Sequence, residues 1–319
     1  MLVLSADDVR SAITMSEAID AVREGFIALS SDQAMIPLRG NLTTTHGVLL
    51  TMPSYLSDTY VVKIVTINDS NAARNLPTVQ AAAMVNDAVT GIPQALMNGE
   101  VLTAIRTGAA SGLATDLLAR PDARVLGVIG KGVQSRTQIE AVCAVRPIEE
   151  IRIYSLHGAQ PLVDELQGHY PARVICAANE GEALDTADVI VAATNSPTPV
   201  VHTEHVKPST HINGIGSFTR QMQEVAAEVV VRSRLVVDHR TAAWVEAGDM
   251  IIPRDQGLLS QDYLPAEIGE IAAGKHPGRQ SDDEITFFKS VGNGVQDNVV
   301  ARRIVEKARR MGLGAEVSL

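Results

Sequence analysis

This 319-residue sequence contains little cysteine and no pattern typical of a secretion signal. Cys143 and Cys176 are the only two cysteines, and both lie in apolar patterns. We therefore expect two buried free thiols in a reducing cytoplasm and no disulfide. The first residues, MLVLSADDVR, lack the basic and apolar regions of a secretion signal, which also favours a cytoplasmic protein.

The sequence also lacks a net positive charge, long apolar runs and metal-binding patterns. The formal net charge of −10 argues against a nucleic-acid partner or an anionic membrane surface. No apolar run approaches the roughly 20 residues that a membrane span needs. The eight histidines include no H-x-x-x-H pair with a carboxylate at ligand spacing, so no metal is expected.

A glycine-rich turn is the most informative stretch that is present. Residues 123–136 read ARVLGVIGKGVQSR, an apolar strand followed by G-x-G-x-x-S and the start of a helix. Gly130 allows the sharp turn, Gly132 allows the backbone to approach a pyrophosphate, and the last position needs only a small residue. The phosphates are expected on the free N–H groups of the helix that begins near Val133. Any tight strand-to-helix turn is the alternative, but a second strand at Ile151 to Tyr154 completes a βαβ unit.

The chain is long enough for two domains, and its patterns differ along its length. From residue 123 onward, strands and helices alternate, which predicts an α/β fold with a Rossmann-type, doubly wound parallel sheet. The first hundred residues read instead as a largely antiparallel α+β domain. We expect residues 1–119 with 295–319 to form a substrate-binding and dimerisation domain, and residues 120–294 to form the cofactor domain.

Several local patterns support the expected first domain. Ser16 to Ser30 has apolar residues at helical spacing. The Asn98-Gly99 dipeptide is typical of a tight hairpin. Thr107 to Leu118 reads as an alanine-rich helix, and Val295 to Met311 as an amphipathic helix that returns to the first domain.

Three basic residues occupy unusual positions in this domain. Lys63 shares a strand face with Val61 and Val65, and Arg106 precedes the helix predicted from Thr107, where the dipole disfavours a cation. Arg39 lies in a loop after a proline. Each has an ordinary alternative: Lys63 extends to solvent, Arg39 lies on a solvated loop, and Arg106 pairs with a local carboxylate. Together they could bind a carboxylate.

Short motifs continue along nearly the whole chain. They are Pro37-Leu38-Arg39, Val62-Lys63-Ile64, Leu76-Pro77-Thr78, Leu102 to Ala109, Gly130 to Ser135, Ala192 to Ser196, His211 to Gly216 and Val291 to Asp297. In order and spacing the chain resembles the ornithine cyclodeaminase and mu-crystallin family. That family also contains archaeal alanine dehydrogenases and several ketimine and cyclic-imine reductases.

The resemblance implies roles for particular residues. Arg39 and Arg106 would bind a substrate carboxylate, and Lys63 would lie at the substrate as a carboxylate partner and as an acid or base. Thr78 and Thr107 would contact the cofactor, with Thr78 near the nicotinamide. Asn195 and Ser196 would line the adenosine side, and Gln134 and Thr194 in the same motifs complete the expected cofactor site. A homodimer joined through the N-terminal sheets is also implied.

Two departures from the cyclodeaminase pattern indicate a branch of the family. Cyclodeaminases carry an acidic residue in the loop after the His-Ile-Asn strand, where this chain has Phe218. They carry another near the first hairpin, where this chain reads Val48-Leu49-Leu50. The segment Gly216 to Thr219 resembles the dehydrogenase and reductase branch, although Arg220 replaces its usual proline.

We therefore expect an NAD(P)H-dependent oxidoreductase that interconverts an α-imino acid, or an α-keto acid plus amine, and an L-amino acid. Arg39 and Arg106 would hold the carboxylate, and Lys63 or a water that it orients would manage the proton. Two alternatives remain: an ornithine cyclodeaminase that forms proline and releases ammonia, and a non-enzymatic binding protein like mu-crystallin. Retention of the three basic residues argues against the second, since a hydrophobic ligand needs no carboxylate clamp.

The choice of cofactor depends on the end of the second strand. Ser155 stands where an NAD-specific site places an acid, so nothing there repels the 2′-phosphate of NADP. Leu156 stands where related chains have arginine, and His157 is mostly neutral at pH 7. We expect both cofactors to be used, with NADPH modestly favoured and the preference growing in mild acid.

Overall fold

The computed structural model describes residues 1–318, except for the side chain of Ala72, and it divides into two compact units. Unit 1 comprises Met1–Arg106 and the residues from Gly292 onward, and unit 2 comprises Thr107–Val291. The first boundary falls within helix α3 (Gly99–Leu118), so one continuous helix begins in unit 1 and ends in unit 2. The expected division, 1–119 with 295–319 and 120–294, places that boundary after the helix instead.

Unit 1 is built on one sheet, whose strand order is β16-β1-β7-β6-β5-β4-β2 with β3 paired to β4. All of its pairings are antiparallel except that of β1 with β7, which confirms the expected antiparallel character of this region. The strands are β1 (Leu2–Leu4), β2 (Ala34–Met35), β3 (Gly40–Thr44), β4 (Gly47–Leu56), β5 (Thr59–Ile67), β6 (Val79–Asp87), β7 (Pro93–Asn98) and β16 (Ala315–Glu316). Helices α1 (Ala6–Ala12), α2 (Met15–Leu29) and α11 (Gly294–Met311) and a 3-10 turn, η1 (Asp69–Arg74), complete the unit.

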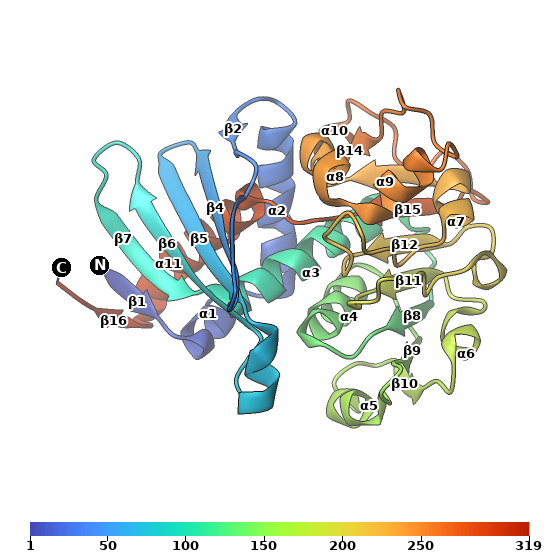
Figure 1. The fold of residues 1–319 in the computed structure, drawn as a ribbon. Coiled ribbons are helices and arrows are strands. Elements are labelled where there is room, and N and C mark those ends of the chain that lie inside the picture. Colours follow the sequence, from blue (N-terminus) through green and yellow to red (C-terminus); the bar gives the residue numbers. More distant parts are fainter. Residues whose placement is uncertain (319) are drawn as a thin grey trace. The chain divides into compact units, whose positions relative to one another are not determined.

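Helix α11 is the element that organises unit 1. It packs on β4, β5 and α2, as Figure 1 shows, so the end of the chain does return to the first domain. At Gly25 of α2, a Cβ would lie 2.9 Å from Val299 of α11, which shows how closely the two helices approach. Gly312 closes α11 in the left-handed conformation, with φ of 67°, as glycine does at many helix ends.

Unit 2 contains one fully parallel sheet with the strand order β10-β9-β8-β11-β12-β15-β13-β14. Starting from β8, the chain places two strands on one side and then returns to the other, which is the doubly wound topology expected from the sequence. The strands are β8 (Val125–Ile129), β9 (Glu150–Tyr154), β10 (Arg173–Cys176), β11 (Val189–Ala192), β12 (His211–Gly214), β13 (Arg234–Val237), β14 (Ala266–Glu267) and β15 (Thr286–Lys289). The helices are α4 (Val133–Val145), α5 (Gln160–Leu166), α6 (Glu180–Leu184), α7 (Ala227–Arg232), α8 (Arg240–Glu246), α9 (Gly248–Asp255) and α10 (Ile268–Ala272), with a 3-10 turn, η2 (Thr203–His205).

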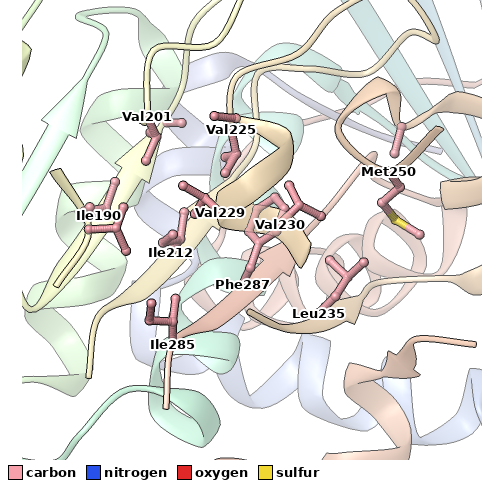
Figure 2. Close-up of a cluster of buried hydrophobic side chains, with 14 of the residues drawn as sticks. Ile190, Val201, Ile212, Val225, Val229, Val230, Leu235, Met250, Ile285 and Phe287 are labelled. Carbon is pink, nitrogen blue, oxygen red and sulfur yellow. The ribbon is translucent and has the colours of Figure 1, made fainter. Parts of the chain in front are cut away.

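A large apolar cluster fills one face of this sheet. In Figure 2, Val229 and Val230 of α7 lie over Ile212 of β12 and Phe287 of β15. All four side chains are at most 1% exposed, so burial of apolar surface holds α7 on the sheet. The predicted strands Val125 to Ile129 and Ile151 to Tyr154 contribute to this core and to a second one on α4 and α5.

Two local predictions in unit 1 are wrong. Asn98-Gly99 is not a hairpin: Asn98 ends β7, its side-chain oxygen accepts from the N–H of Val101 at 2.9 Å, and Gly99 begins α3. The same pair suits a helix start because asparagine caps helices well, and a Cβ on Gly99 would lie 2.7 Å from the backbone of Ala81. Helix α3 begins at Gly99 and not at Thr107, so Arg106 lies inside the helix. The prediction that Arg106 lies at the helix start, where the dipole disfavours a cation, is therefore wrong.

Both cysteines are free thiols, as expected, but they are half-buried and not fully buried as the sequence predicted. Burial raises the pKa of Cys143 to about 12, which keeps that thiol protonated and unreactive. Within residues 1–318, no helix combines the length and apolar character needed to cross a membrane.

Candidate active site

A buried charge cluster in unit 1 brings two of the three predicted basic residues together. Lys63 Nζ lies 2.9 Å from Asp297 Oδ1, and Arg106 Nε lies 3.0 Å from the same oxygen. The three side chains are 1%, 7% and 0% exposed, respectively. The alternative that Lys63 extends to solvent is therefore wrong, and the carboxylate that pairs with Arg106 is distant in sequence.

Each member of the cluster is fixed by a different element. Lys63 faces inward from β5 beside Val61 and Val65, which are both buried as their spacing predicted. Asp297 lies in the first turn of α11, where Asn293 caps the helix by accepting from the N–H of Val295 at 3.1 Å. Strand β5, the first turn of α11 and the second turn of α3 therefore place the three side chains at one buried position.

Arg39 joins the same region through Gly292. Arg39 lies in the irregular segment before β3, but its side chain is half-buried, and Nη2 donates to the carbonyl of Gly292 at 2.9 Å. Gly292 has φ of 75°, and a Cβ there would lie 2.4 Å from Arg106 Nη1. Glycine is required at this position both by its backbone conformation and by the closeness of the guanidinium.

Two buried cations of the cluster share a single carboxylate. Lys63 Nζ and Arg106 Nε both lie against Asp297 Oδ1. Several buried polar atoms in the first turn of α11 and its cap also have no hydrogen-bond partner: Asn293 Nδ2, Gln296 Nε2 and Asp297 Oδ2. Two buried cations that share one carboxylate, beside buried donors without partners, favour binding of a small polar anion, for which a carboxylate is a good match.

The pKa of Lys63 is lowered to about 7, mainly because burial penalises its charged form and also because Arg106 and Arg39 lie near. Asp297 acts in the opposite direction, both through its charge and through the hydrogen bond that it accepts. The two arginines therefore lower this pKa, but burial is the larger cause. A lysine with such a pKa can both give and take a proton at neutral pH.

Asp297, Gln296 and Gly292 were not identified as site residues from the sequence. All three lie in the motif Val291 to Asp297, and the sequence alone shows that this motif ends in an acidic residue at the start of an amphipathic helix. An acidic residue in the first turn of a helix usually lies on the surface, where it interacts favourably with the helix dipole. The sequence therefore did not indicate that Asp297 is completely buried.

Unit 2 contains the expected dinucleotide turn. Gly130 has φ of 117°, and a Cβ there would lie 2.4 Å from the carbonyl of Ala193. A Cβ on Gly132 would meet nothing within 4 Å, so the backbone is open to a ligand. Helix α4 begins at Val133 and has no side-chain cap, and Gln134 Oε1 is buried without a hydrogen-bond partner. An open glycine at an uncapped helix start fits a pyrophosphate.

The turn after β9 holds the other predicted cofactor residues of the first βαβ unit. Ser155 begins a turn in which its carbonyl accepts from the N–H of Gly158 at 2.8 Å, and His157 is exposed within it. Lys131 of the glycine turn donates to the carbonyls of His157 and Gly158 at 2.7 and 2.8 Å. Lys131 was not among the predicted cofactor residues, and it places an ammonium at the turn that faces the ribose in such folds.

The remaining predicted cofactor residues lie in several places. Thr194, Asn195 and Ser196 follow β11 at the carboxyl edge of the parallel sheet, where this fold binds nucleotides. Thr107 lies in α3 within unit 2, and its carbonyl accepts from Gln138 Nε2 at 3.3 Å. Thr78 lies in unit 1 just before β6, where its carbonyl accepts from the N–H of Asn68 at 2.9 Å.

Comparison with known protein families identifies the family to which this chain belongs. The family model "Ornithine cyclodeaminase/mu-crystallin family" matches residues 1–312. The chain belongs to the ornithine cyclodeaminase/mu-crystallin family. The resemblance seen in the short motifs is thereby confirmed over nearly the whole length.

Individual members of the family are similar throughout. The chain is 37% identical over 324 residues to the Δ1-pyrroline-2-carboxylate reductase of Bacillus thuringiensis subsp. konkukian (strain 97-27), covering 99% of each protein. It resembles the structure of Thermococcus litoralis Δ1-pyrroline-2-carboxylate reductase in complex with NADH and L-proline, with a TM-score of 0.96, 40% identity and coverage of 99% and 100%. An archaeal alanine dehydrogenase dimer with bound NAD has a TM-score of 0.94, 34% identity and coverage of 100% and 99%.

Proposed function

We propose that this family member reduces a cyclic α-imino acid, with Δ1-pyrroline-2-carboxylate as the leading substrate and L-proline as the product. At the level of class, the chain is an NAD(H)-dependent oxidoreductase that acts on CH–NH or CH–NH2 groups. The observation that carries the substrate proposal is the buried pair of Lys63 and Arg106 on one carboxylate, with the half-buried Arg39 joined to the same region through Gly292. It offers an anchor for a substrate carboxylate beside a lysine that can exchange a proton at neutral pH.

The chemistry follows from these residues. Arg39 and Arg106 hold the substrate carboxylate and so fix the position of the adjacent imine carbon, which removes much of the entropic part of the barrier. Lys63, or a water that it orients, gives a proton to the imine nitrogen, because a protonated imine accepts hydride far more readily. Gly130, Gly132 and the N–H groups at the start of α4 would hold the cofactor. A bound nicotinamide supplies the hydride in reduction and accepts it in oxidation.

A cyclodeaminase is less well supported by the surroundings of Lys63. The cross-strand neighbours of Lys63 in the sheet are Met52 and Ala83, both buried and apolar. Asp297, the carboxylate that contacts the cluster in the described residues, is already paired with Lys63 and Arg106. A second amine on the substrate, as ornithine carries, therefore has no anionic partner in this cluster.

A substrate screen tests the proposal. We expect NADH oxidation with Δ1-pyrroline-2-carboxylate and Δ1-piperideine-2-carboxylate, and weaker activity with pyruvate or other α-keto acids mixed with ammonia or methylamine. L-ornithine serves as the control and should release no ammonia. Ammonia release from ornithine without net cofactor oxidation would instead establish the cyclodeaminase function.

Removing the charge of Asp297 should move the pH dependence of reduction. Asp297 raises the pKa of Lys63, so Asp297→Asn lowers that pKa below about 7. Protonated Lys63 is then lost at lower pH, and the falling limb of kcat for imine reduction should shift down by about one pH unit or more. A pH profile of kcat measures the shift. An unchanged limb in the folded variant would show that Asp297 does not tune the acid.

For the cofactor we infer use of both NADH and NADPH, with NADPH modestly favoured. Ser155 has no charge to repel a 2′-phosphate, and Lys131 adds an ammonium at the same turn. The preference is measured as the ratio of the kcat/KM values for NADPH and NADH. Lys131→Met should lower kcat/KM for NADPH and leave that for NADH nearly unchanged. A strong preference for NADH would contradict this assignment.

The outer face of the unit 1 sheet supports a homodimer. Tyr60 and Ile64 of β5 and Met84 of β6 are apolar and 45%, 46% and 37% exposed, and they point away from the Lys63 face. Exposed apolar patches on a sheet are typical of interfaces. We expect Ile64→Asp to yield a monomer in light scattering after gel filtration. Val89→Asp, at an 83% exposed apolar residue in the turn after β6, is the control and should remain dimeric. A monomeric wild-type protein would contradict the assignment.

A further inference from the structure

A buried carboxylate in unit 2 joins the loops that follow β11 and β12. Glu224 is 0% exposed, and its carboxylate accepts four hydrogen bonds. Oε1 accepts from the N–H and the hydroxyl of Thr194 at 2.6 and 2.7 Å. Oε2 accepts from the N–H groups of Gly216 and Ser217 at 2.6 and 2.9 Å. Thr194 follows β11, whereas Gly216 and Ser217 follow β12, its parallel neighbour.

The four donors require an ionised carboxylate. Three of them are backbone N–H groups, which cannot accept a proton. The hydroxyl of Thr194 accepts from the N–H of Ser196 at 3.1 Å, so its own hydrogen points to Glu224. Burial raises the pKa of Glu224, but a protonated carboxyl would place its O–H against one of these donors. Charged hydrogen bonds of this kind are stronger than neutral ones.

Glu224 is itself held rigidly. Its N–H donates to Asp249 Oδ1 at 2.7 Å, and its carbonyl accepts from the N–H groups of Val200 and Val201 at 2.8 and 3.0 Å. Val201 and Val225 form a bridge and pack into the apolar cluster, as Figure 2 shows. Buried Lys289 lies 3.0 Å from Asp249 Oδ2 and balances part of the negative charge.

The loops that Glu224 joins leave no space between them. A Cβ on Gly216 would lie 1.9 Å from the carbonyl of Thr194. Both loops lie at the carboxyl ends of parallel strands, and dinucleotides bind just outside these ends in doubly wound sheets. Their relative position therefore sets the shape of the surface that a cofactor meets.

We propose that Glu224 is a positioning residue that holds the loops after β11 and β12 in the geometry that binds the nicotinamide dinucleotide. It acts through Thr194 and Gly216 and does not itself touch the cofactor. The inference rests on the proposed oxidoreductase function for its ligand, but not on the identity of the imine. Its loss weakens cofactor binding much more than it slows the chemistry of the bound complex.

The test is Glu224→Gln, which keeps the length of the side chain and one acceptor oxygen but turns an amide NH2 toward two of the donors. We expect the Kd of NADH, measured by its fluorescence without substrate, and the KM of NADH to rise about tenfold or more. The kcat at saturating NADH and the KM of the imine should change by less than about threefold.

Asp188→Asn is the matched control. Asp188 Oδ2 accepts from the N–H groups of Arg124 and Val125 at 2.8 and 3.0 Å, and Oδ1 pairs with Lys207 at 2.9 Å. This clamp lies at the amino end of β8, the opposite edge of the sheet. We expect a lower Tm with an unchanged Kd for NADH. An equal rise in Kd for both variants would reduce Glu224 to a general stabilising residue and overturn the proposal.

If Glu224→Gln does not fold, Thr194→Val and Thr194→Ser decide the matter. Valine removes the hydroxyl that links Ser196 to Glu224, and serine retains it. A raised Kd for NADH with valine that serine restores supports the proposal. Equal Kd values for valine, serine and wild type would overturn it. Failure of every imine with a wild type that binds NADH would refute the proposed reaction and leave this inference standing.

Discussion

Arg106→Ala should raise the KM for the imino acid by at least about 30-fold, or remove turnover altogether, while the protein remains folded. The expected loss of about 2 to 5 kcal/mol is that of a buried, charge-assisted contact to a carboxylate. Arg106 is 5% exposed and shares Asp297 with Lys63, so no water can easily replace its guanidinium. Steady-state kinetics with the best imine from the screen gives the result directly.

A second buried arginine supplies the control for this prediction. Arg146 is 8% exposed and donates to the backbone carbonyls of Thr115, Asp116, Ala119 and Arg120 in unit 2. Arg146→Ala should lower the Tm and leave the KM for the imine unchanged. Added guanidinium should partly restore turnover to Arg106→Ala but have no such effect on wild type. Unaltered kinetics in a folded Arg106→Ala protein would remove this residue from the substrate site.

Lys63→Met should lower kcat by about 100-fold to 10,000-fold and change KM much less, because it removes a general acid and keeps most of the packing on β5. In the wild-type protein, the rates of imine reduction and of amino-acid oxidation should depend on pH in opposite ways. Reduction requires protonated Lys63, so its rate falls as pH rises through about 7, where Lys63 loses its proton. Oxidation of the amino acid requires neutral Lys63, so its rate rises through the same pH.

Both limbs should disappear in Lys63→Met. Lys307→Met is the matched control, because Lys307 is an ion-paired lysine of α11 in the same unit, bound to Glu17 and outside the cluster. It should keep the wild-type pH profile. If Lys63→Met retains most of its kcat and both limbs, the proton must come from water or another group.

The backbone architecture followed from local patterns in the sequence. The run Val125 to Ile129 and the G-x-G turn predicted a buried strand, a sharp turn and a helix start, and the structure has all three within a residue. These features depend on residues that are neighbours in the chain, so periodicity and glycine placement report them well. Asn98-Gly99 shows the limit of this reasoning, since the same dipeptide serves a hairpin or a helix cap and only the packing on Ala81 decides.

Only part of the charge cluster could be predicted from the sequence. The odd position of Lys63 on an apolar strand face indicated a buried charge, and it is buried. Its partner Asp297 is 234 residues away in sequence, and nothing local in the chain joins β5 to the first turn of α11. Contacts of this kind depend on the tertiary fold, and Glu224, which joins two loops from a third segment, was missed for the same reason.

Transfer of deuterium from [4,4-²H₂]NADH to Δ1-pyrroline-2-carboxylate tests the central claim most directly, because it follows the atom that the proposed reaction moves. The product, analysed by mass spectrometry and chiral chromatography, should be L-proline with a single deuterium at its α-carbon and one cofactor oxidised for each proline formed. Absence of deuterated proline, together with unlabelled proline and ammonia formed from L-ornithine in the same protein sample, would contradict the account.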